Sequence, residues 1–273
     1  MTLTAAAHPL LDAGWQIEPV AGLVGSCVTG ASLLDPLADE QVTALRALIA
    51  DSGVVVFPRQ NLDEAGHVRL ARLLGTPKPP PEYIPSLADA GYPEISVIST
   101  ANGLAYTSDR WHSDVTWMPN PPQYSILHMR QRPPAGGDTM WSSQVVAYDR
   151  LSDPFRTMLT GLTAVHRLPN GSGISAIHPI VVEHPLTCRR ALFINSVFTE
   201  RVCELNERES AVLLGFLFEH TTQPEWTCRW QWSEGDVAMW DNHFVQHYAI
   251  NDYGSAPRTI NRIETDGPRP LSA

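Results

Sequence analysis

The chain of 273 residues is longer than the modal domain, but all-β barrels and sandwiches of roughly 200–250 residues form single domains. Its 43% apolar residues suffice for a sizeable core, and 19 basic against 29 acidic side chains give a formal charge of −10. This acidic balance disfavours nucleic acids and anionic membranes as partners, although a locally basic pocket can still bind a small anion. We therefore expect one domain over residues 1–273 that acts on a small molecule.

The cysteines and the N-terminus indicate a cellular compartment. None of Cys27, Cys188, Cys203 and Cys228 lies in a Cys-x-x-Cys pair, which disfavours a zinc knuckle or a redox dithiol. Scattered thiols in a chain of this length are typical of a cytosolic protein. Residues 1–19 carry no basic segment before an apolar one, and no run of 18 apolar residues occurs. We expect a cytoplasmic protein without a secretory signal or a spanning helix.

Taken in chain order, the pattern of apolar residues predicts many short strands and a few helices. Short strands with glycine turns are expected over 15–34, and helical spacing recurs over 207–220. Such a pattern is typical of a mainly β fold with flanking helices, here a double-stranded β-helix, or cupin-like jelly roll. The predicted helices cover 39–49, 61–74, 146–162 and 207–220, and the remaining strands cover 54–57, 94–99, 123–130, 140–142, 180–183, 191–195, 227–232, 237–240, 244–250 and 258–263.

Two connecting segments bear on the position of a site. The proline-rich segment 76–93 fits either an interdomain linker or a loop over the barrel mouth, and its short length favours the loop. Residues Asn170–Gly173 form a glycine-rich turn, which we expect to be a mobile lid.

The segment Trp111–Val115 contains a possible metal-binding motif. In an extended strand, His112 and Asp114 point to one side and Ser113 to the other. Joined by a distant second histidine, for which His247 is the best candidate, they would form the 2-His-1-carboxylate triad of non-haem Fe(II) oxygenases. The chain has ten histidines, however, and a lone histidine is more often a surface or core residue.

Two arginines near the C-terminus are candidate anion-binding residues. Arg258 and Arg262 lie four residues apart, so they share one face of a strand. A guanidinium binds a carboxylate or sulfonate through two parallel hydrogen bonds. Either arginine could instead form a surface ion pair, which is common in an acidic protein.

Four segments of the chain resemble the taurine dioxygenase (TauD/TfdA) family of Fe(II)/2-oxoglutarate-dependent oxygenases. They are WHSDVTW, GGDTMWSS, HPLTCRRALFINSVFTERV and WDNHFVQHYAINDY, followed by Arg258 and Arg262, and the similarity runs from about residue 15 to 267. The resemblance implies that His112, Asp114 and His247 bind iron and act as the catalytic centre. It also implies that Thr139 and Arg258 bind the distal carboxylate of 2-oxoglutarate, and that Arg262 binds the anionic group of the substrate.

The remaining pocket residues agree with the family pattern only in part. Pro80 stands where the taurine enzyme has a histidine, His243 replaces an arginine without an evident reason, and the segment 166–178 is shorter than in taurine dioxygenase. These differences make taurine itself doubtful as the substrate. The candidate substrate-binding residues are Arg262, Tyr83, Val115, Phe198 and Ser108, the last in place of an asparagine.

The resemblance implies an oxidoreductase that uses Fe(II), 2-oxoglutarate and O2 to oxidise a C–H bond of a small anionic substrate, releasing succinate and CO2. The outcome would be hydroxylation, with cleavage of a carbon–heteroatom bond where the carbon carries one. Desaturation of an amino-acid-like substrate, a zinc hydrolase on the same ligands, and a non-catalytic jelly-roll protein are the alternatives. The resemblance further implies a homo-oligomer, a dimer or tetramer. The aromatic residues expected to wall the pocket, if they are not ordinary core residues, are Trp111, Trp117, Phe198 and Trp240.

Overall fold

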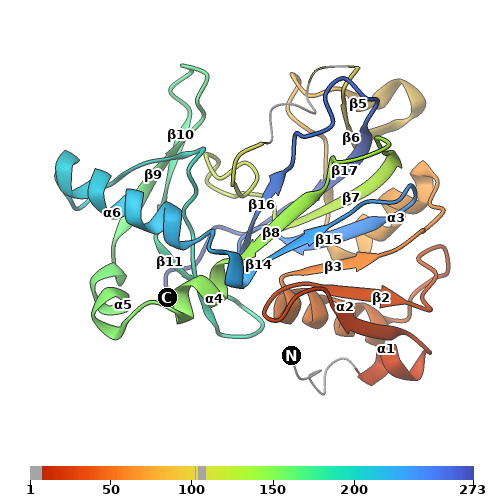
Figure 1. Cartoon of the computed structure of the whole chain (residues 1–273), viewed down its shortest axis with the longest axis horizontal. Coiled ribbons are helices and arrows are strands. Elements are labelled where there is room, and N and C mark those ends of the chain that lie inside the picture. The colour runs from red at the N-terminus through yellow and green to blue at the C-terminus, as the bar shows by residue number, and fades with distance from the viewer. Residues whose placement is uncertain (1–7, 102, 104–108) are drawn as a thin grey trace.

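Two β-sheets face each other and form the barrel that carries the site (Figure 1). The computed structural model describes residues 8–101, 103 and 109–273. In these residues the larger sheet has nine strands, ordered β1-β2-β3-β15-β7-β17-β6-β5 with β4 beside β17. The smaller sheet has the order β14-β8-β16. The strands of the larger sheet are β1 (Gln16–Pro19), β2 (Ser26–Thr29), β3 (Val54–Phe57), β4 (Pro77–Lys78), β5 (Ser86–Leu87), β6 (Tyr92–Ser99), β7 (Tyr124–Gln131), β15 (Val237–Asp241) and β17 (Thr259–Thr265), and those of the smaller sheet are β8 (Thr139–Ser143), β14 (Thr227–Trp230) and β16 (Val245–Ala249).

Helices cover the outer face of the larger sheet. The helix α3 begins after Asp63, whose side chain accepts a hydrogen bond from the backbone of Gly66 at 2.7 Å and so satisfies one free donor of the first turn. Its apolar face, which includes Val68 and Leu70, packs against strand residues such as Ile126. Burial of one such aliphatic side chain contributes ~1.5–3 kcal/mol. The helical elements that precede β6 in the chain are α1 (His8–Asp12), α2 (Asp39–Ser52), α3 (Glu64–Leu74) and the 3-10 turn η2 (Ala88–Ala90).

Strand register decides which side chains face the barrel interior. Along β17, Arg262 pairs with Leu127 of β7, and Glu264 pairs with Ser125. On the smaller sheet His247 pairs with Trp141. Because paired residues point to the same face, these side chains all line the space between the sheets. Its apolar part is filled by tryptophans, including the edge-to-face pair Trp141 and Trp240 at 5.8 Å.

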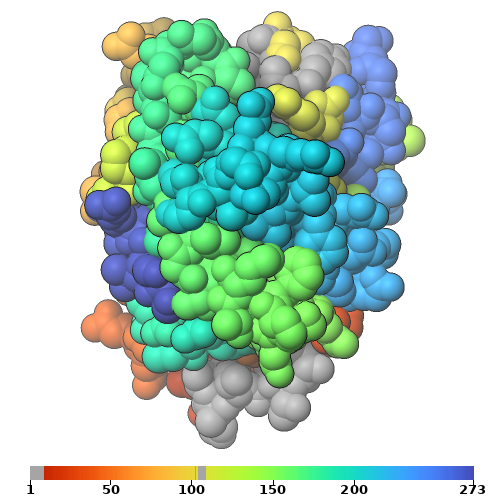
Figure 2. All heavy atoms as spheres, turned by 90° about the vertical axis from the view of Figure 1, so that its left-hand side faces the viewer, coloured from red at the N-terminus to blue at the C-terminus, as the bar shows by residue number. Residues whose placement is uncertain are grey.

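Residues 144–226, which we call the insertion, leave the barrel after β8 and return at β14. They pack around a separate apolar cluster on one side of the barrel (Figure 1), and α6 crosses the face that Figure 2 shows. The last residues of the chain lie against the insertion, where Val182 bridges to Ser272. The elements of the insertion are α4 (Gln144–Asp149), α5 (Asp153–Leu159), β9 (Thr163–Arg167), β10 (Ser175–Pro179), β11 (Val181–Glu183), β12 (Arg190–Leu192), β13 (Thr199–Val202), α6 (Glu207–His220) and the 3-10 turn η4 (Pro224–Trp226).

The mainly β architecture with flanking helices agrees with the sequence, but the prediction of one helix over 146–162 is wrong. The chain forms two helices there, and the second begins with Pro154 in its first turn, where the missing N–H of proline has no cost. The strands β9, β10 and β13 are not predicted by the sequence pattern, and the turn Asn170–Gly173 is the tip between β9 and β10. No helix in the described residues is both long and apolar enough to span a bilayer.

Candidate active site

Two histidines distant in sequence are joined by backbone hydrogen bonds. His112 N donates to His247 O at 3.1 Å, and His247 N donates to His112 O at 2.8 Å, so the two form an isolated antiparallel bridge. Their ring centroids lie 4.1 Å apart. Ser113 points away from them, and its hydroxyl donates to Val245 O at 2.8 Å. The backbone of β16 therefore sets the spacing of the two imidazoles.

Asp114 lies in a turn, so the prediction of an extended strand through this residue is wrong. The chain turns because Val115 adopts a φ of 57°, which is uncommon for a β-branched residue and costs on the order of 1–3 kcal/mol. Asn242 offsets this cost: its Oδ1 accepts from Asp114 N at 2.6 Å, and its Nδ2 donates to Asp114 O at 2.9 Å. Ser125 Oγ donates to Asp114 Oδ2 at 3.1 Å. The carboxylate is thus oriented from both the backbone and the side chain.

The three predicted ligands converge on one point. Asp114 Oδ1 lies 3.6 Å from His112 Nε2 and 3.9 Å from His247 Nε2, and one ligand atom from each residue falls within 4.8 Å of the others. His112 Nδ1 donates to the carbonyl of Arg110 at 2.7 Å, which leaves the Nε2 lone pair facing Asp114. All three side chains are buried. This arrangement fits a divalent metal ion that requires neutral imidazoles and an ionised carboxylate.

Electrostatics favours the same protonation states. Burial lowers the pKa of His247 to about 3 and also lowers the pKa of His112, so both imidazoles are neutral. Burial opposes ionisation of Asp114, but the nearby Arg262 and the two imidazoles hold its pKa well below the usual range. The chain therefore presents two nitrogen lone pairs and one carboxylate without having to release protons near neutral pH.

Arg262 is held by two carboxylates. Its Nη1 donates to Asp114 Oδ1 at 2.8 Å and lies 3.4 Å from Glu264 Oε1. Burial and the charge of Asp114 raise the pKa of Glu264, to about 7, although Arg262 opposes the shift. Glu264 is not among the residues that the sequence predicts for the site. Glu264 lies two residues after Arg262, so both share one face of a strand, and this spacing could have identified it from the sequence.

Arg258 contacts the segment that leads into β8, the strand that begins at Thr139. Arg258 Nε donates to Gly137 O at 3.1 Å, two residues before Thr139, and the guanidinium lies 5.7 Å from the centroid of the Tyr253 ring. Thr139 Oγ1 accepts from Trp232 Nε1 at 2.9 Å. Arg258 precedes β17, and a bulge separates Thr259 from Ile260, yet both arginines remain buried. Burial lowers the pKa of Arg258.

A pocket of about 200 Å³ opens beside the triad and is lined by residues that lie far apart in the chain, between Tyr83 and Arg262. Its lining includes Arg262 and two of the triad residues, and the residues that the insertion contributes to it are all apolar. Of the predicted substrate-binding residues, Ser108 lies outside the described residues, and the other four line this pocket. The lining residues are Tyr83, Ile84, Arg110, His112, Asp114, Val115, Trp117, Leu168, Pro169, Val197, Phe198 and Arg262.

Comparison with known proteins identifies the family. Residues 16–263 match the model of the "Taurine catabolism dioxygenase TauD, TfdA family". The chain belongs to this family. It is therefore an enzyme of the 2-oxoglutarate-dependent dioxygenase class, with 2-oxoglutarate and O2 as co-substrates, which confirms the resemblance in the sequence.

Individual relatives are similar over most of their length. An "Alpha-ketoglutarate-dependent sulfate ester dioxygenase" of Pseudomonas putida is 33% identical, covering 98% of this chain and 94% of the relative. An "Alkylsulfatase" of Acinetobacter baylyi is 31% identical over 92% of this chain and 85% of the relative. A crystal structure described as a "Taurine Dioxygenase from Burkholderia xenovorans" has 35% identity and a TM-score of 0.86, covering 94% of this chain and 91% of that one. This likeness confirms the jelly-roll prediction.

Two of the family differences now have a structural setting. The short segment 166–178 forms the end of β9, the hairpin tip and the start of β10, and its Leu168 and Pro169 reach the pocket. His243 is buried: its backbone N–H donates to Asp241 Oδ1 at 3.0 Å, and its ring lies 5.6 Å from Phe193 of the insertion. His243 therefore belongs to the packing between barrel and insertion. Mobility of the hairpin tip stays a prediction.

The predicted aromatic wall divides into two groups. Trp117 and Phe198 line the pocket. Trp240 lies inside the barrel core, 4.8 Å from the His247 ring, and Trp111 packs against Tyr248 at 5.6 Å. The alternative interpretation, that the tryptophan is an ordinary core residue, is thus right for Trp240.

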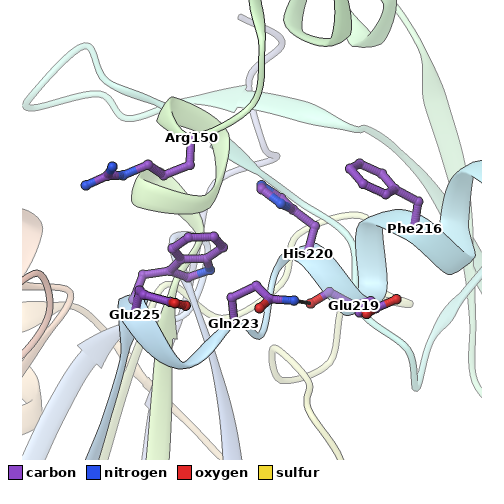
Figure 3. A pocket seen from close by; sticks show the side chains of 7 residues that line it. Arg150, Phe216, Glu219, His220, Gln223 and Glu225 are labelled. Atoms are coloured by element: carbon purple, nitrogen blue, oxygen red, sulfur yellow. Dashed lines mark hydrogen bonds between the residues drawn. The ribbon is translucent and has the colours of Figure 1, made fainter.

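A second and larger pocket lies on the insertion, near the C-terminal end of α6 (Figure 3). It measures about 580 Å³ and is bounded by Arg150, Glu219, Glu225 and the stacked rings of Phe216 and His220. His220 Nε2 donates to Ala147 O at 2.7 Å. None of the triad or arginine residues described above lines it, so the smaller pocket is the candidate active site.

Proposed function

We propose that His112, Asp114 and His247 bind Fe(II) through Nε2, Oδ1 and Nε2. The convergence of these three atoms within 4.8 Å is the single observation that carries the proposal. Two imidazoles and one carboxylate match the ligand set of non-haem Fe(II) oxygenases, which leaves open positions on the metal. When bound, the iron supplies the activation of O2 by which 2-oxoglutarate is decarboxylated and a substrate C–H bond is oxidised.

In this proposal Arg258 and Thr139 bind the distal carboxylate of 2-oxoglutarate. Arg258 is 3% exposed, and no described carboxylate forms an ion pair with it. A buried guanidinium without an anionic partner is costly, and the co-substrate would provide that partner. Its hydrogen bond to Gly137 O fixes the guanidinium plane. Thr139 follows Gly137 by two residues, and its hydroxyl would add a further hydrogen bond to the carboxylate.

The substrate in this proposal is a small organic monoanion with an apolar body, a sulfate ester or a sulfonate. Arg262 binds the anion, and Tyr83 also lines the pocket. The apolar body packs against Val115 and Phe198, whose ring lies 6.4 Å from that of His112. Ser108 belongs to the proposed substrate contacts on the resemblance alone, because it lies outside the described residues. The names of the sulfate ester and sulfonate relatives support this class.

The side chains of this enzyme contribute orientation, charge and exclusion of water. Arg262 and the apolar wall hold one substrate carbon beside the metal ligands, so that this carbon, and not others, is oxidised. If the oxidised carbon carries the sulfate oxygen, the hydroxylated product collapses to an aldehyde and inorganic sulfate. A cytoplasmic homo-oligomer, dimer or tetramer, completes the proposal on the strength of the sequence resemblance, and analytical ultracentrifugation tests the assembly.

The experiment has a spectroscopic and a chemical arm. Anaerobic addition of Fe(II) and 2-oxoglutarate should produce a weak visible charge-transfer band, which a hydrolase or an inert binding protein would not show. The second arm measures succinate formation with alkyl sulfates, alkylsulfonates and aryloxyacetates. His112→Ala is the control and should lack both signals. Absence of the band in the wild-type protein would overturn the iron site, and turnover restricted to uncharged substrates would overturn the substrate class.

A further inference from the structure

Glu264 is a buried carboxylate to which the proposed reaction assigns no role. It is 7% exposed and lies two residues after Arg262 on β17, so both side chains point into the barrel. It pairs across the strands with Ser125, whose hydroxyl donates to Asp114. Glu264, Arg262 and Asp114 thus meet in one interior cluster next to the pocket.

The donor atoms of Arg262 are used unequally. Its Nη1 contacts both carboxylates, at 2.8 Å from Asp114 Oδ1 and 3.4 Å from Glu264 Oε1. Its Nε is buried and has no hydrogen-bond partner in the described part of the chain, and the same holds for Glu264 Oε1. A guanidinium offers Nε and Nη2 along one edge for bidentate binding of an oxyanion. With both carboxylates at Nη1, that edge is the one left for the substrate.

Asp114 by itself is an insufficient partner for Nη1. Its Oδ1 is also the oxygen that faces the Nε2 atoms of His112 and His247, so in the proposed function the same atom binds the metal. A carboxylate oxygen bound to a cation is a weaker acceptor for a second cation. Glu264 Oε1 is then the acceptor within reach of Nη1 that is free of other partners.

We propose that Glu264 is a positioning residue, which holds Nη1 of Arg262 so that the Nε–Nη2 edge stays available to the anion of the substrate. This inference rests on the proposed function, because that function assigns the anion to Arg262. The acceptor oxygen of Glu264 does the positioning. Glutamine has the same length and keeps a carbonyl oxygen, so it should position Arg262 as glutamate does. Leucine has no oxygen and should not.

The test compares Glu264→Gln with Glu264→Leu, and the probe is hexyl sulfate. Glu264→Leu should raise the KM and the calorimetric Kd for hexyl sulfate about tenfold or more, the loss expected when a charge-assisted contact is misaligned. Glu264→Gln should change both by about threefold or less, and the KM for 2-oxoglutarate and kcat should stay within about twofold in both variants. The matched control is Glu64→Gln. Glu64 Oε1 lies 3.3 Å from Arg130 Nη2, and this ion pair is not part of the described site.

The outcomes separate this inference from the function on which it rests. Arg262→Ala should weaken hexyl sulfate binding more than either Glu264 variant. If Arg262→Ala weakens binding and Glu264→Leu does not, the role of Glu264 is wrong and the anion site stands. If Arg262→Ala leaves the Kd unchanged, the anion site itself is wrong. A merely structural role of Glu264, which also overturns the inference, would lower the thermal midpoint and change both KM values and kcat together.

Discussion

The barrel side and the insertion side of the pocket are built in different ways. On the barrel side, Asp114 accepts hydrogen bonds from Asn242, Ser125 and Arg262, and its neighbours are almost fully buried. On the insertion side, apolar groups such as Phe198 line the pocket, and this residue is only half-buried. Polar atoms with several partners keep one geometry, whereas an apolar wall can change shape at small cost. In the proposed function, the barrel would therefore fix the metal and anion sites, and the insertion would provide the surface that selects a substrate.

The two sides meet at a layer of buried polar groups next to the turn that carries Asp114. Thr116 Oγ1 receives a hydrogen bond from Asn195 Nδ2 at 3.1 Å and lies 2.9 Å from His166 Nδ1. His178 Nε2 lies 2.8 Å from Thr116 O. Asn195 also accepts from the backbone of Phe198 at 2.9 Å, so the same residue anchors the pocket wall. The position of the wall is thus tied to the turn that carries Asp114.

The largest effect is expected from Asp114→Asn. The substitution removes the negative charge that the two imidazoles and Arg262 share, and an amide is a poor metal ligand. We expect turnover to fall on the order of a thousandfold or more, because the reaction depends on the metal. Succinate formation at saturating 2-oxoglutarate measures it, and the far-ultraviolet circular dichroism should be unchanged. Turnover within tenfold of wild type would contradict the proposed triad.

A smaller loss is expected from Asn242→Ala, which removes the side chain that fixes the turn at Asp114. Loss of a residue that orients a metal ligand costs roughly 10–100-fold in metal affinity. The matched control is Asn195→Ala, which removes a buried amide on the insertion side and should leave metal affinity within about threefold. Titration of the metal-free protein with Co(II) measures both. Equal loss in the two variants would show that barrel and insertion contribute alike to the metal site.

Acid should weaken the junction between the two sides. Burial lowers the pKa of His166 to about 3 and that of His178 to about 4, from the ordinary histidine value of about 6.5. Below pH ~6.5 the unfolded chain binds protons that these buried rings do not, so stability is constant above this pH and falls as the pH decreases toward 4. Urea unfolding at pH 7.5 and pH 5 should show a loss of about 2 kcal/mol per such histidine.

The variant His178→Gln tests this assignment. It keeps a donor for the carbonyl of Thr116 and cannot take up a proton, so its unfolding free energy should depend less on pH between 7.5 and 5 than that of the wild type. An unchanged pH dependence would place the acid sensitivity elsewhere.

The smallest effect is expected from Phe198→Ala on the insertion side. Removal of this ring enlarges the pocket without touching a polar atom, and a change of apolar contact alters discrimination by about tenfold per side chain or less. We expect the preference among alkyl sulfates to shift toward bulkier chains while the KM for 2-oxoglutarate stays constant. The ratio of kcat/KM between dodecyl and butyl sulfate measures the shift. A rise in the KM for 2-oxoglutarate would show that the wall also shapes the co-substrate site.

The sequence predicts which side chains of the candidate site come together better than it predicts their local structure. The spacing of His112 and Asp114, and the choice of His247, agree with the geometry, because backbone pairing of one strand with one segment is enough to bring them together. The turn at Asp114 escapes prediction because it depends on Asn242, which lies 128 residues later in the chain. The same limit applies to the insertion, where β9, β10 and β13 are short and gain their stability from packing against one another.

The sequence by itself determines the family, the mainly β fold and the residues that can bind a metal and an anion, since these depend on residue type and spacing. Only the tertiary structure decides the state of each group. It places Glu264 against Arg262, moves Trp240 from the expected pocket wall into the core, and leaves Arg258 without a carboxylate partner among the described residues. Burial and long-range contacts set charges and orientations, and both arise between segments that no local pattern connects.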